Sequence, residues 1–372
     1  MSKLCRSTIC LLLFFTVTSA GVAQNREEIS IPNVLGYQTL KCDFHIHTVF
    51  SDGDVWPTVR VQEAWLEGLD AIAITDHVEY RPHSQDIEAD HNRAYEIAKP
   101  LADQTGIILI RGSEISRKMP PGHINALFLK NANLIEREDW WEACAEAREQ
   151  GAFVIWNHPG WKEQQQTIQW WNEHTRLVAA GIMKGIEVFN DKDYYPLALK
   201  WADEKGLTIF AASDIHLPAS MEYGEGKRRR PITLVFATDK SEESIKQALF
   251  ERRTAACFGD TIVGDRRFLT PLFMNSIEIR GSRNRLQNLE IKTISIHNNS
   301  DITYKLKKRQ PSVGFSSPSS VTLPARRTVN IALEGTSDEV ALMPVLKMFY
   351  EVTNMITMKG EKLPVNIEVP NK

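Results

Sequence analysis

The sequence has few cysteines, no long apolar run beyond its N-terminus and no excess of charge of one sign. Five cysteines in 372 residues, none in a CxxC pair, argue against a disulfide scaffold and against a structural zinc site. The 44 basic and 47 acidic residues give a formal net charge of −3, so no broad basic surface for nucleic acid is indicated. The 42% of hydrophobic residues is typical of a soluble globular chain, and the length predicts about two domains.

The one continuously apolar stretch lies at the N-terminus. Lys3 and Arg6 precede the run ICLLLFFTV at positions 9–17, and small residues follow as far as Ala23. This order predicts a secretory signal peptide over residues 1–23. A membrane anchor is the alternative, but a spanning helix needs about 20 apolar residues and this run has about half of that. We therefore expect a periplasmic or secreted protein that is not stably inserted in a membrane after cleavage.

Cleavage after residue 23 changes the charge and the cysteine count. It removes two basic residues and no acidic one, so the mature charge becomes −3 − 2 = −5. It also removes two of the five cysteines, leaving Cys42, Cys144 and Cys257 far apart in the chain. We expect these three to be small buried side chains.

Between residues 40 and 237, short apolar runs alternate with longer amphipathic ones. The candidate strands are 40–46, 70–75, 107–112, 123–129, 152–157, 185–190, 207–213 and 232–237. The helix-length stretches between them include 58–67, 86–102, 137–149 and 194–204. This alternation favours parallel strands joined by crossover helices, hence an α/β barrel or an open sheet.

Past Pro271 the pattern changes. Apolar and polar residues alternate in MNSIEIR, LEIKTISIHN, ITYKLKK, VTLPARRTVNIAL and PVNIEV, with turn residues between them. Period-two alternation predicts a small antiparallel β domain with one wet face. We therefore divide the chain into a signal peptide over 1–23, an α/β domain over 24–265 and a β-rich domain over 270–372. The last shows no chemical motif, so we expect a packing or recognition role for it.

Histidines and carboxylates fall where the candidate strands end. In CDFHIHTVFSDG, His45 and His47 are two residues apart on a strand and so share one face, and Asp52 follows in the next loop. The same residue types recur at Asp76, His77, Glu114, His123, His158, Asp214 and His216. The carboxyl ends of parallel strands meet on one face, where sites are built. Imidazoles and carboxylates bind divalent ions, and so many ligands predict two or three ions bridged by a carboxylate.

The motifs HxHTxxSDG, TDH, a strand-end Glu, NHP and SDIH, in that order, resemble the PHP (polymerase and histidinol phosphatase) metal-dependent phosphoesterases over about residues 40–260. The resemblance implies a distorted (β/α)7 barrel with a site for two or three ions of zinc, manganese or iron. It implies a first ion held by His45, His47, Glu114 and Asp214, a second held by Glu114, His123 and His158, and a third held by Asp52, His77 and His216.

The chemistry that follows is hydrolysis of a phosphate ester by a hydroxide that bridges two ions. Paired cations about 3.5 to 4 Å apart neutralise the phosphate oxygens and lower the pKa of bound water. Glu114 and His216 are then catalytic candidates, and a third ion or a nearby acid would stabilise the leaving alkoxide. Asp76 is a third candidate. It either orients a neighbouring imidazole or holds the turn after its strand.

Several residues are weaker candidates for substrate binding. We expect Asn190, at the end of the sixth strand, to face the pocket. Arg228 and Arg229, with Arg230, form a possible phosphate clamp, although a charge run is usually a solvated face. The same two alternatives apply to Arg117 and Lys118.

Two tryptophans near a predicted ligand also have two alternative roles. Trp156 and Trp161 flank His158, and either form an aromatic wall for the substrate or simply bury apolar area. We interpret the histidines without spaced partners as structural or solvent-facing; they are His83, His91, His174 and His297.

The expected export of the protein and its negative net charge restrict the class of phosphate ester that we expect as substrate. A histidinol phosphatase would serve a cytosolic pathway, and a proofreading exonuclease would favour a basic groove. The combination of signal peptide, PHP motifs and C-terminal β domain is most similar to bacterial PHP enzymes that hydrolyse organophosphate diesters. We therefore expect a phosphodiesterase acting on small phosphate esters and not on nucleic acid. The alternatives are a phosphomonoesterase and a metal-loaded binding module without turnover.

Overall fold

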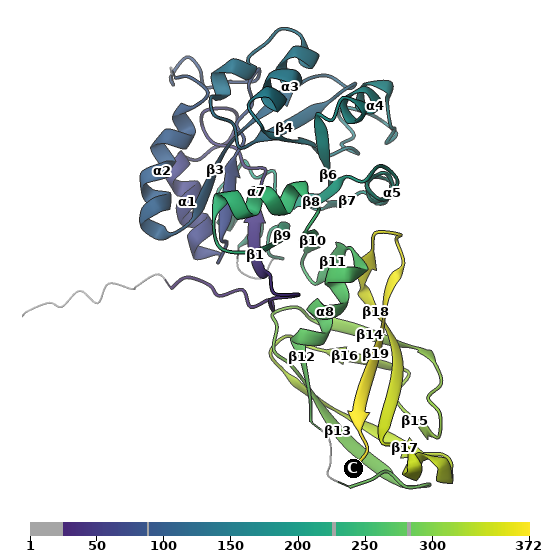
Figure 1. The fold of residues 1–372 in the computed structure, drawn as a ribbon. Helices are drawn as coiled ribbons and strands as arrows, with labels where there is room; N and C mark the ends of the chain where they lie inside the picture. Colours follow the sequence, from purple (N-terminus) through teal and green to yellow (C-terminus); the bar gives the residue numbers. More distant parts are fainter. Residues whose placement is uncertain (1–24, 88, 225–227, 281–283) are drawn as a thin grey trace, which may run out of the picture.

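The computed structural model describes residues 25–372 except 88, 225–227 and 281–283, so the predicted signal peptide lies outside the described residues. An α/β domain is followed by a β-rich domain, with helix α8 (Arg266–Ser276) between them (Figure 1). None of the helices in the described part of the chain is long and apolar enough to span a membrane.

The α/β domain contains all eight strands that the apolar runs predicted. They are β1 (Gln38–Asp43), β2 (Ala71–Ile74), β3 (Ile108–Ser116), β4 (His123–Leu127), β5 (Phe153–Trp156), β6 (Met183–Asn190), β8 (Thr208–Ala212) and β9 (Ile232–Ala237). Every residue of β2, β5, β8 and β9 is buried, as expected for strands covered on both faces. A short β7 (Asp193–Tyr194) pairs with the end of β6.

The sheet is mixed, which corrects the expectation of parallel strands throughout. β1–β2, β2–β3, β5–β6 and β6–β8 pair in parallel, whereas β4 runs antiparallel to β3 and β5, and β9 runs antiparallel to β1. Only residues 117–122 separate β3 from β4, which is too few for a parallel crossover. Among the described residues no backbone ladder joins β8 to β9, and the two strands meet through the Thr233 side chain instead, whose hydroxyl donates to the Ala211 carbonyl oxygen (2.9 Å). The distorted (β/α)7 barrel that the resemblance implied is therefore observed as an α/β domain with a mixed sheet.

Helices pack on this sheet close to where the sequence placed them. They are α1 (Pro57–Leu66), α2 (Arg93–Thr105), α3 (Trp140–Glu149), α4 (Asn172–Ala179), α5 (Pro196–Lys205), α6 (Ala219–Tyr223) and α7 (Glu242–Phe250). α2 begins seven residues later than the predicted start at residue 86, because residues 90–92 form a turn in which the Asp90 side chain accepts from the Asn92 amide (2.9 Å). The three cysteines are buried and unpaired, as expected.

The β-rich domain consists of two antiparallel sheets. One contains β12 (Ile277–Arg280), β13 (Ile291–Asn298), β15 (Phe315–Ser316) and β17 (Thr328–Gly335), and the other contains β14 (Tyr304–Gln310), β16 (Ser320–Leu323), β18 (Val345–Thr357) and β19 (Lys362–Pro370). The alternating burial along β13 is the pattern predicted for a strand with one wet face. Met274 to Ser276, expected to open a strand, lie in α8 instead, and β18 was not predicted.

A hairpin connects the two domains through hydrogen bonds. β10 (Thr254–Phe258) pairs with β9, β11 (Thr261–Gly264) pairs with β10, and β11 then pairs in parallel with β18, where Ile262 lies opposite Met355. One sheet therefore runs from the α/β domain into the β-rich domain (Figure 1).

Candidate metal centre

His45 and His47 lie just beyond β1, which ends at Asp43, and both side chains are fully buried. Ile46 forms a parallel bridge with Ile215, so this segment stays extended after the strand ends. The two imidazole rings therefore point to the same side, with ring centroids 5.1 Å apart.

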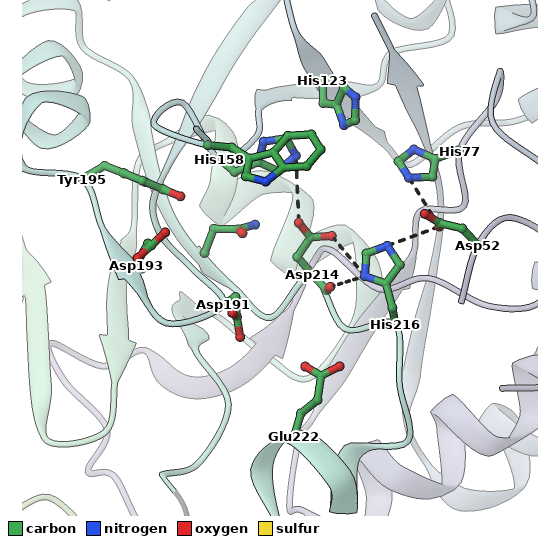
Figure 2. Close-up of a pocket in the computed structure, with 12 residues that line it drawn as sticks. Asp52, His77, His123, His158, Asp191, Asp193, Tyr195, Asp214, His216 and Glu222 are labelled. Carbon is green, nitrogen blue, oxygen red and sulfur yellow. Dashed lines mark hydrogen bonds and ion pairs between the residues drawn. The ribbon is translucent and has the colours of Figure 1, made fainter. Parts of the chain in front are cut away.

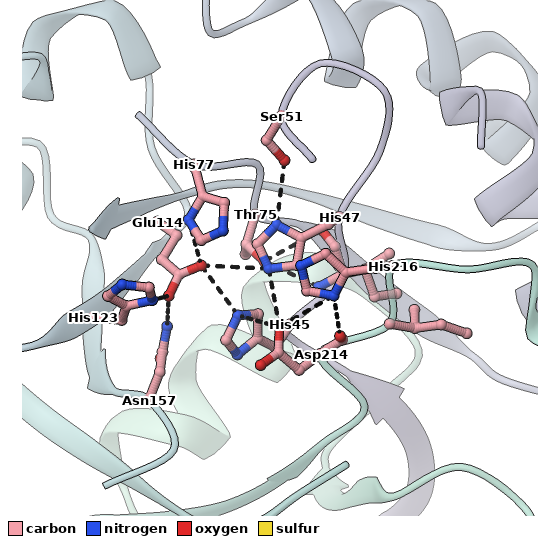
Figure 3. A network of polar contacts seen from close by, with 12 residues as sticks. His45, His47, Ser51, Thr75, His77, Glu114, His123, Asn157, Asp214 and His216 are labelled. Carbon is pink, nitrogen blue, oxygen red and sulfur yellow. Dashed lines mark hydrogen bonds and ion pairs between the residues drawn. The ribbon is translucent and has the colours of Figure 1, made fainter. Parts of the chain in front are cut away.

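The structure brings all nine predicted ligands into one cluster (Figures 2 and 3). Their ligand atoms form four overlapping groups in which all atoms lie within 4.8 Å of one another. The groups are His47, Asp52, His77 and His216; His45, His158 and Asp214; His45, His47 and Glu114; and His77, Glu114 and His123. His158 is grouped with His45 and Asp214, and it also lies close to the two residues that the resemblance placed with it: its Nε2 is 3.7 Å from Glu114 Oε1, and its ring centroid is 5.0 Å from that of His123.

Glu114 is the centre of this cluster, and its side chain is fully buried. Its Oε2 lies 3.3 Å from His45 Nε2 and 3.3 Å from His47 Nε2, and its Oε1 lies 2.8 Å from His123 Nδ1 (Figure 3). The two oxygens thus face different histidines. A carboxylate placed in this way has the geometry to bridge two ions.

Some of the buried atoms in the cluster have no hydrogen-bond partner. His47 Nε2 lies 3.0 Å from Asp214 Oδ1 and Asp52 Oδ1 lies 3.2 Å from His216 Nε2, yet neither His47 Nε2 nor Asp52 Oδ1 makes a hydrogen bond. Buried polar atoms are rarely left unsatisfied, because desolvation without a partner is costly. Ligand atoms that approach each other without hydrogen bonding are what a shared divalent ion requires, so these residues fit a centre of several ions.

A solved structure from Bacteroides vulgatus, described as a two-domain protein containing a predicted PHP-like metal-dependent phosphoesterase, is similar to this chain over both domains. The two are 43% identical, the match covers 93% of this chain and 100% of the other, and the TM-score is 0.88. The chain belongs to the PHP-like metal-dependent phosphoesterase family.

Two further matches each cover part of this PHP-like chain. Residues 277–368 match a family model described as an Ig-like domain, which is the two-sheet β domain that follows α8. An uncharacterized protein of Methanocaldococcus jannaschii is 28% identical over 193 residues, which cover 49% of this chain and 84% of the relative.

Hydrogen bonds at the Nδ1 atoms fix the orientation of two imidazoles in the PHP-like site. His45 Nδ1 lies 2.8 Å from Glu187 Oε1, and His216 Nδ1 lies 2.7 Å from the Asp214 carbonyl oxygen. Both Nδ1 atoms are therefore donors, which leaves each Nε2 free for an ion. Sequence reasoning missed Glu187, whose signal was a lone carboxylate inside the apolar run GIEVFN.

Glu187 also positions two other site residues. Its Oε2 accepts from the His158 backbone amide (2.7 Å) and from the Asn190 side-chain amide (2.8 Å). His158 itself has a φ of 26°, in the left-handed region that non-glycine residues seldom adopt. One buried carboxylate thus holds a ligand, a strained ligand loop and a residue that lines the cavity.

Asp76 follows β2, but its carboxylate holds the loop after β1 and not the turn after its own strand. Its carboxylate accepts from the Thr48 amide, the Thr48 hydroxyl and the Ser51 hydroxyl, each at 2.7 Å, which holds the loop after β1. The Ser51 hydroxyl oxygen lies 3.3 Å from His47 Nδ1 and so connects Asp76 to that imidazole. Burial raises the pKa of Asp76 above its usual range, although these hydrogen bonds oppose the shift.

The charges of Glu114 and His47 suit metal ligands at neutral pH, whereas His77 carries a proton. Burial by itself would raise the pKa of Glu114, but the imidazoles of His77, His123 and His45 hold that pKa well below its usual range. Burial, together with the charge of His77, lowers the pKa of His47 to about 3, so its imidazole is neutral. Burial opposes but does not prevent the rise of the His77 pKa to about 10 beside Glu114 and Asp52, so His77 must lose a proton to bind an ion.

The loops around the cluster have an unusual backbone at two positions, Gly53 and Asp214. A Cβ on Gly53 would lie 2.7 Å from the His47 carbonyl carbon, so this close approach requires glycine. Asp214 has a φ of 53°, the left-handed conformation in which its loop turns back toward the cluster after β8.

Arg60, which sequence reasoning did not single out, ties the ligand loops together from α1. Its guanidinium is buried and donates to the carbonyl oxygens of His47 (2.8 Å), Ile215 (3.0 Å), His216 (2.6 Å) and Leu217 (2.9 Å). The segments after β1 and β8 are therefore held by one side chain.

Two neighbouring cavities border the cluster. One, of about 460 Å³, is lined by Asn190, as expected, with Asp191, Asp193, Tyr195 and Glu222 (Figure 2). The other, of about 560 Å³, is lined by Tyr80, Ser116, Arg117, Lys118, Met119, Glu163 and Gln164, so two basic side chains face one carboxylate that it does not share with the first cavity. Asp52, His77, His123 and Trp161 border both cavities. We refer to them as the acidic cavity and the basic cavity.

The structure does not bring the arginine run to the cluster. The Arg228 guanidinium lies over the Phe258 ring, Arg229 pairs with Glu27 at 2.6 Å, and both line a separate hollow beside the β-rich domain. Arg230 is buried and pairs with Glu67 (2.7 Å) and Asp43 (3.2 Å). Each of the three side chains is engaged elsewhere, so the arginine run does not form a phosphate clamp at the cluster.

Of the two tryptophans beside His158, one lines the cavities and the other is part of the core. Trp161 borders the cavities, whereas Trp156 is fully buried and stacks on His174 with ring centroids 3.6 Å apart. His174 is thus structural, as interpreted. His91, 3.3 Å from Glu136, and His297, 2.8 Å from Thr328, also lie outside the cluster.

Proposed function

We propose that this PHP-like chain hydrolyses small organic phosphodiesters. The observation that carries the proposal is that two cavities border the ligand cluster and share Asp52, His77 and His123. A phosphate seated on the cluster would have space for one ester substituent in each cavity, as a diester needs. A monoester would use only one of the two cavities. The carboxylates of the acidic cavity would repel a nucleic acid backbone.

The donor set supports two or three divalent ions of zinc, manganese or iron. His45, His47, Glu114 and Asp214 would hold one, and Asp52, His77 and His216 would hold another. His123 and His158, which lie 2.8 Å and 3.7 Å from Glu114 Oε1, would hold a further ion together with Glu114. Bound divalent ions would neutralise the phosphate oxygens and lower the pKa of water toward neutrality.

The residues of the chain prepare this reaction. Glu114 stays ionised and keeps the surrounding imidazoles in place, and Trp161 covers one side of the phosphate position. In the hydrolysis, a water oxygen forms a bond to phosphorus while the bond from phosphorus to one ester oxygen breaks. The alcohol leaves with one proton of the water, and a phosphomonoester remains.

The test uses purified mature chain loaded with manganese or zinc. We expect bis(p-nitrophenyl) phosphate to be hydrolysed with a higher kcat/KM than p-nitrophenyl phosphate, and Glu114→Ala to lower that kcat/KM by about 100-fold or more. Glu243→Ala, on the exposed face of α7, is the matched control and should retain the activity.

Each other outcome contradicts a different part of the proposal. Turnover of neither ester would overturn the enzyme proposal and favour a metal-loaded binding module. Preference for the monoester would favour a phosphomonoesterase. A metal content of one ion per chain would reject the bridged centre.

We also propose that residues 1–23 direct export, so that the enzyme acts in the periplasm or outside the cell. The support is the order of basic, apolar and small residues in this segment. N-terminal sequencing of the protein made from the full-length gene should begin at Gln24. A full-length chain that stays in the cytosol would contradict the proposal.

A further inference from the structure

The acidic cavity differs from the basic one in charge. Five carboxylates and no lysine or arginine are among the described residues that line it: Asp52, Asp191, Asp193, Asp214 and Glu222. Asp52 and Asp214 are predicted metal ligands, which leaves three carboxylates, Asp191, Asp193 and Glu222, that line the cavity without being predicted ligands (Figure 2).

Two of these three carboxylates have no basic partner. Asp191 is paired with Lys192 at 3.3 Å and accepts from the Tyr223 hydroxyl at 2.9 Å. No ion pair is formed by Asp193 or Glu222 within the described part of the chain. Their negative charge is therefore uncompensated at the cavity.

A polar side chain directed into the same cavity is also left without a partner. Tyr195 is only 8% exposed, and its hydroxyl points into the cavity (Figure 2). It makes no hydrogen bond with any residue that the structure describes. Burial and the charges of Asp193, Glu187 and Asp214 raise the pKa of Tyr195, so the hydroxyl is a donor for a ligand oxygen.

The spacing of these three carboxylates favours an organic cation over a metal ion as the ligand of the cavity. Asp191, Asp193 and Glu222 belong to none of the metal-ligand groups found among the described residues, so their oxygens do not converge on one point. A cation with its charge spread over several ångströms fits this arrangement better. Trp161, which is 37% exposed at the same cavity, offers an aromatic ring of the kind that attracts alkylammonium groups.

We propose that the acidic cavity selects a phosphodiester whose alcohol on this side carries an alkylammonium group. This inference rests on the proposed phosphodiesterase function and specifies its substrate class. The ammonium group would lie between Asp193 and Glu222 beside Trp161, the Tyr195 hydroxyl would donate to an oxygen of the ester, and the second substituent would occupy the basic cavity.

The experiment compares two esters with the same leaving group and the same shape. p-Nitrophenyl phosphocholine carries a quaternary ammonium, and p-nitrophenyl 3,3-dimethylbutyl phosphate replaces its nitrogen by carbon. We expect metal-loaded enzyme to prefer the choline ester by about tenfold in kcat/KM. Asp193→Asn and Glu222→Gln should each bring that ratio closer to one, whereas Glu243→Gln, with the same change of charge on α7, should preserve it.

A binding measurement makes the test independent of turnover. In calorimetry with metal-loaded protein, choline should bind more tightly than 3,3-dimethylbutanol, and Asp193→Asn should remove the difference. Equal kcat/KM for the two esters, with normal hydrolysis of bis(p-nitrophenyl) phosphate, would overturn this inference alone. Preference for the p-nitrophenyl phosphodiester of glycerol over the choline ester would overturn it in favour of hydroxyl recognition. Absence of turnover of every ester would instead overturn the proposed function, while the calorimetry would still decide whether the cavity selects a cation.

Discussion

At the scale of single residues, the metal centre depends on side chains that are not ligands themselves. Glu187 accepts from His45 Nδ1 and from the His158 amide, and Ser51 connects His47 to Asp76. The contacts of His45 and His47 fix which imidazole nitrogen carries the proton, and therefore which one is available to an ion. The contact with the His158 amide fixes the backbone of that ligand loop instead. The ligand residue types set what can bind, and these partners set how well the ligands are oriented.

Replacing Glu187 by glutamine tests this dependence. Glu187→Gln keeps the shape of the side chain but removes the charge that accepts from His45, so we expect metal affinity to fall by about 10- to 100-fold. Competition with a coloured chelator measures the affinity. Glu204→Gln, which removes an exposed carboxylate on α5, is the control and should leave metal affinity unchanged. An unaltered affinity in Glu187→Gln would show that His45 is oriented by packing alone.

At the scale of elements, the site is formed by two loops that are distant in the sequence. The loop after β1 supplies His47 and the loop after β8 supplies His216, and the buried guanidinium of Arg60 donates to the backbone of both. Pro57 starts α1 and so places Arg60 in its first turn, facing the two loops. α1 is therefore part of the support of the site as well as of the core.

Removal of this guanidinium should loosen both loops. Arg60→Met leaves four carbonyl oxygens and Glu63 without their partner, so we expect a loss of about 3 kcal/mol or more in the free energy of unfolding. Metal affinity should fall in the same variant. Urea unfolding and chelator competition measure the two effects.

The control for this prediction is Arg93→Met on α2. Arg93 makes only an exposed pair with Glu96, so its loss should change stability by about 0.5 kcal/mol or less. Arg60→Met with unchanged stability and unchanged metal affinity would contradict the role assigned to Arg60.

At the scale of the whole molecule, the two domains share one hydrogen-bonded sheet. The ladder between β11 and β18 places Ile262 opposite Met355, and both side chains are fully buried. Separation of the domains would expose a strand edge and apolar surface on both sides. We infer that the domains stabilise each other.

The full chain should therefore unfold in one cooperative thermal transition, with the calorimetric enthalpy equal to the van't Hoff enthalpy. Met355→Ala should lower the temperature of that single transition, because removal of a buried methionine costs about 2 to 5 kcal/mol. Differential scanning calorimetry measures both. Two separate transitions in the wild-type protein, with only one shifted by Met355→Ala, would show that the domains unfold independently.

The sequence by itself determined eight strands of the α/β domain and the residues of the candidate metal cluster. The apolar runs marked those eight strands, because strands covered on both faces are largely apolar. Histidines and carboxylates at the strand ends marked the residues that the structure gathers into one cluster, since strand ends gather on one face of such a sheet.

Only the tertiary structure decided the direction of β4 and β9, the role of Glu187 and Arg60, and the placement of the arginine run. Strand direction depends on pairing partners and loop paths, which residue periodicity does not record. A buried Glu or Arg acquires its role from the groups that surround it, and those groups come from distant parts of the chain. The sequence specified which chemistry is available, and the fold specified which side chains take part in it.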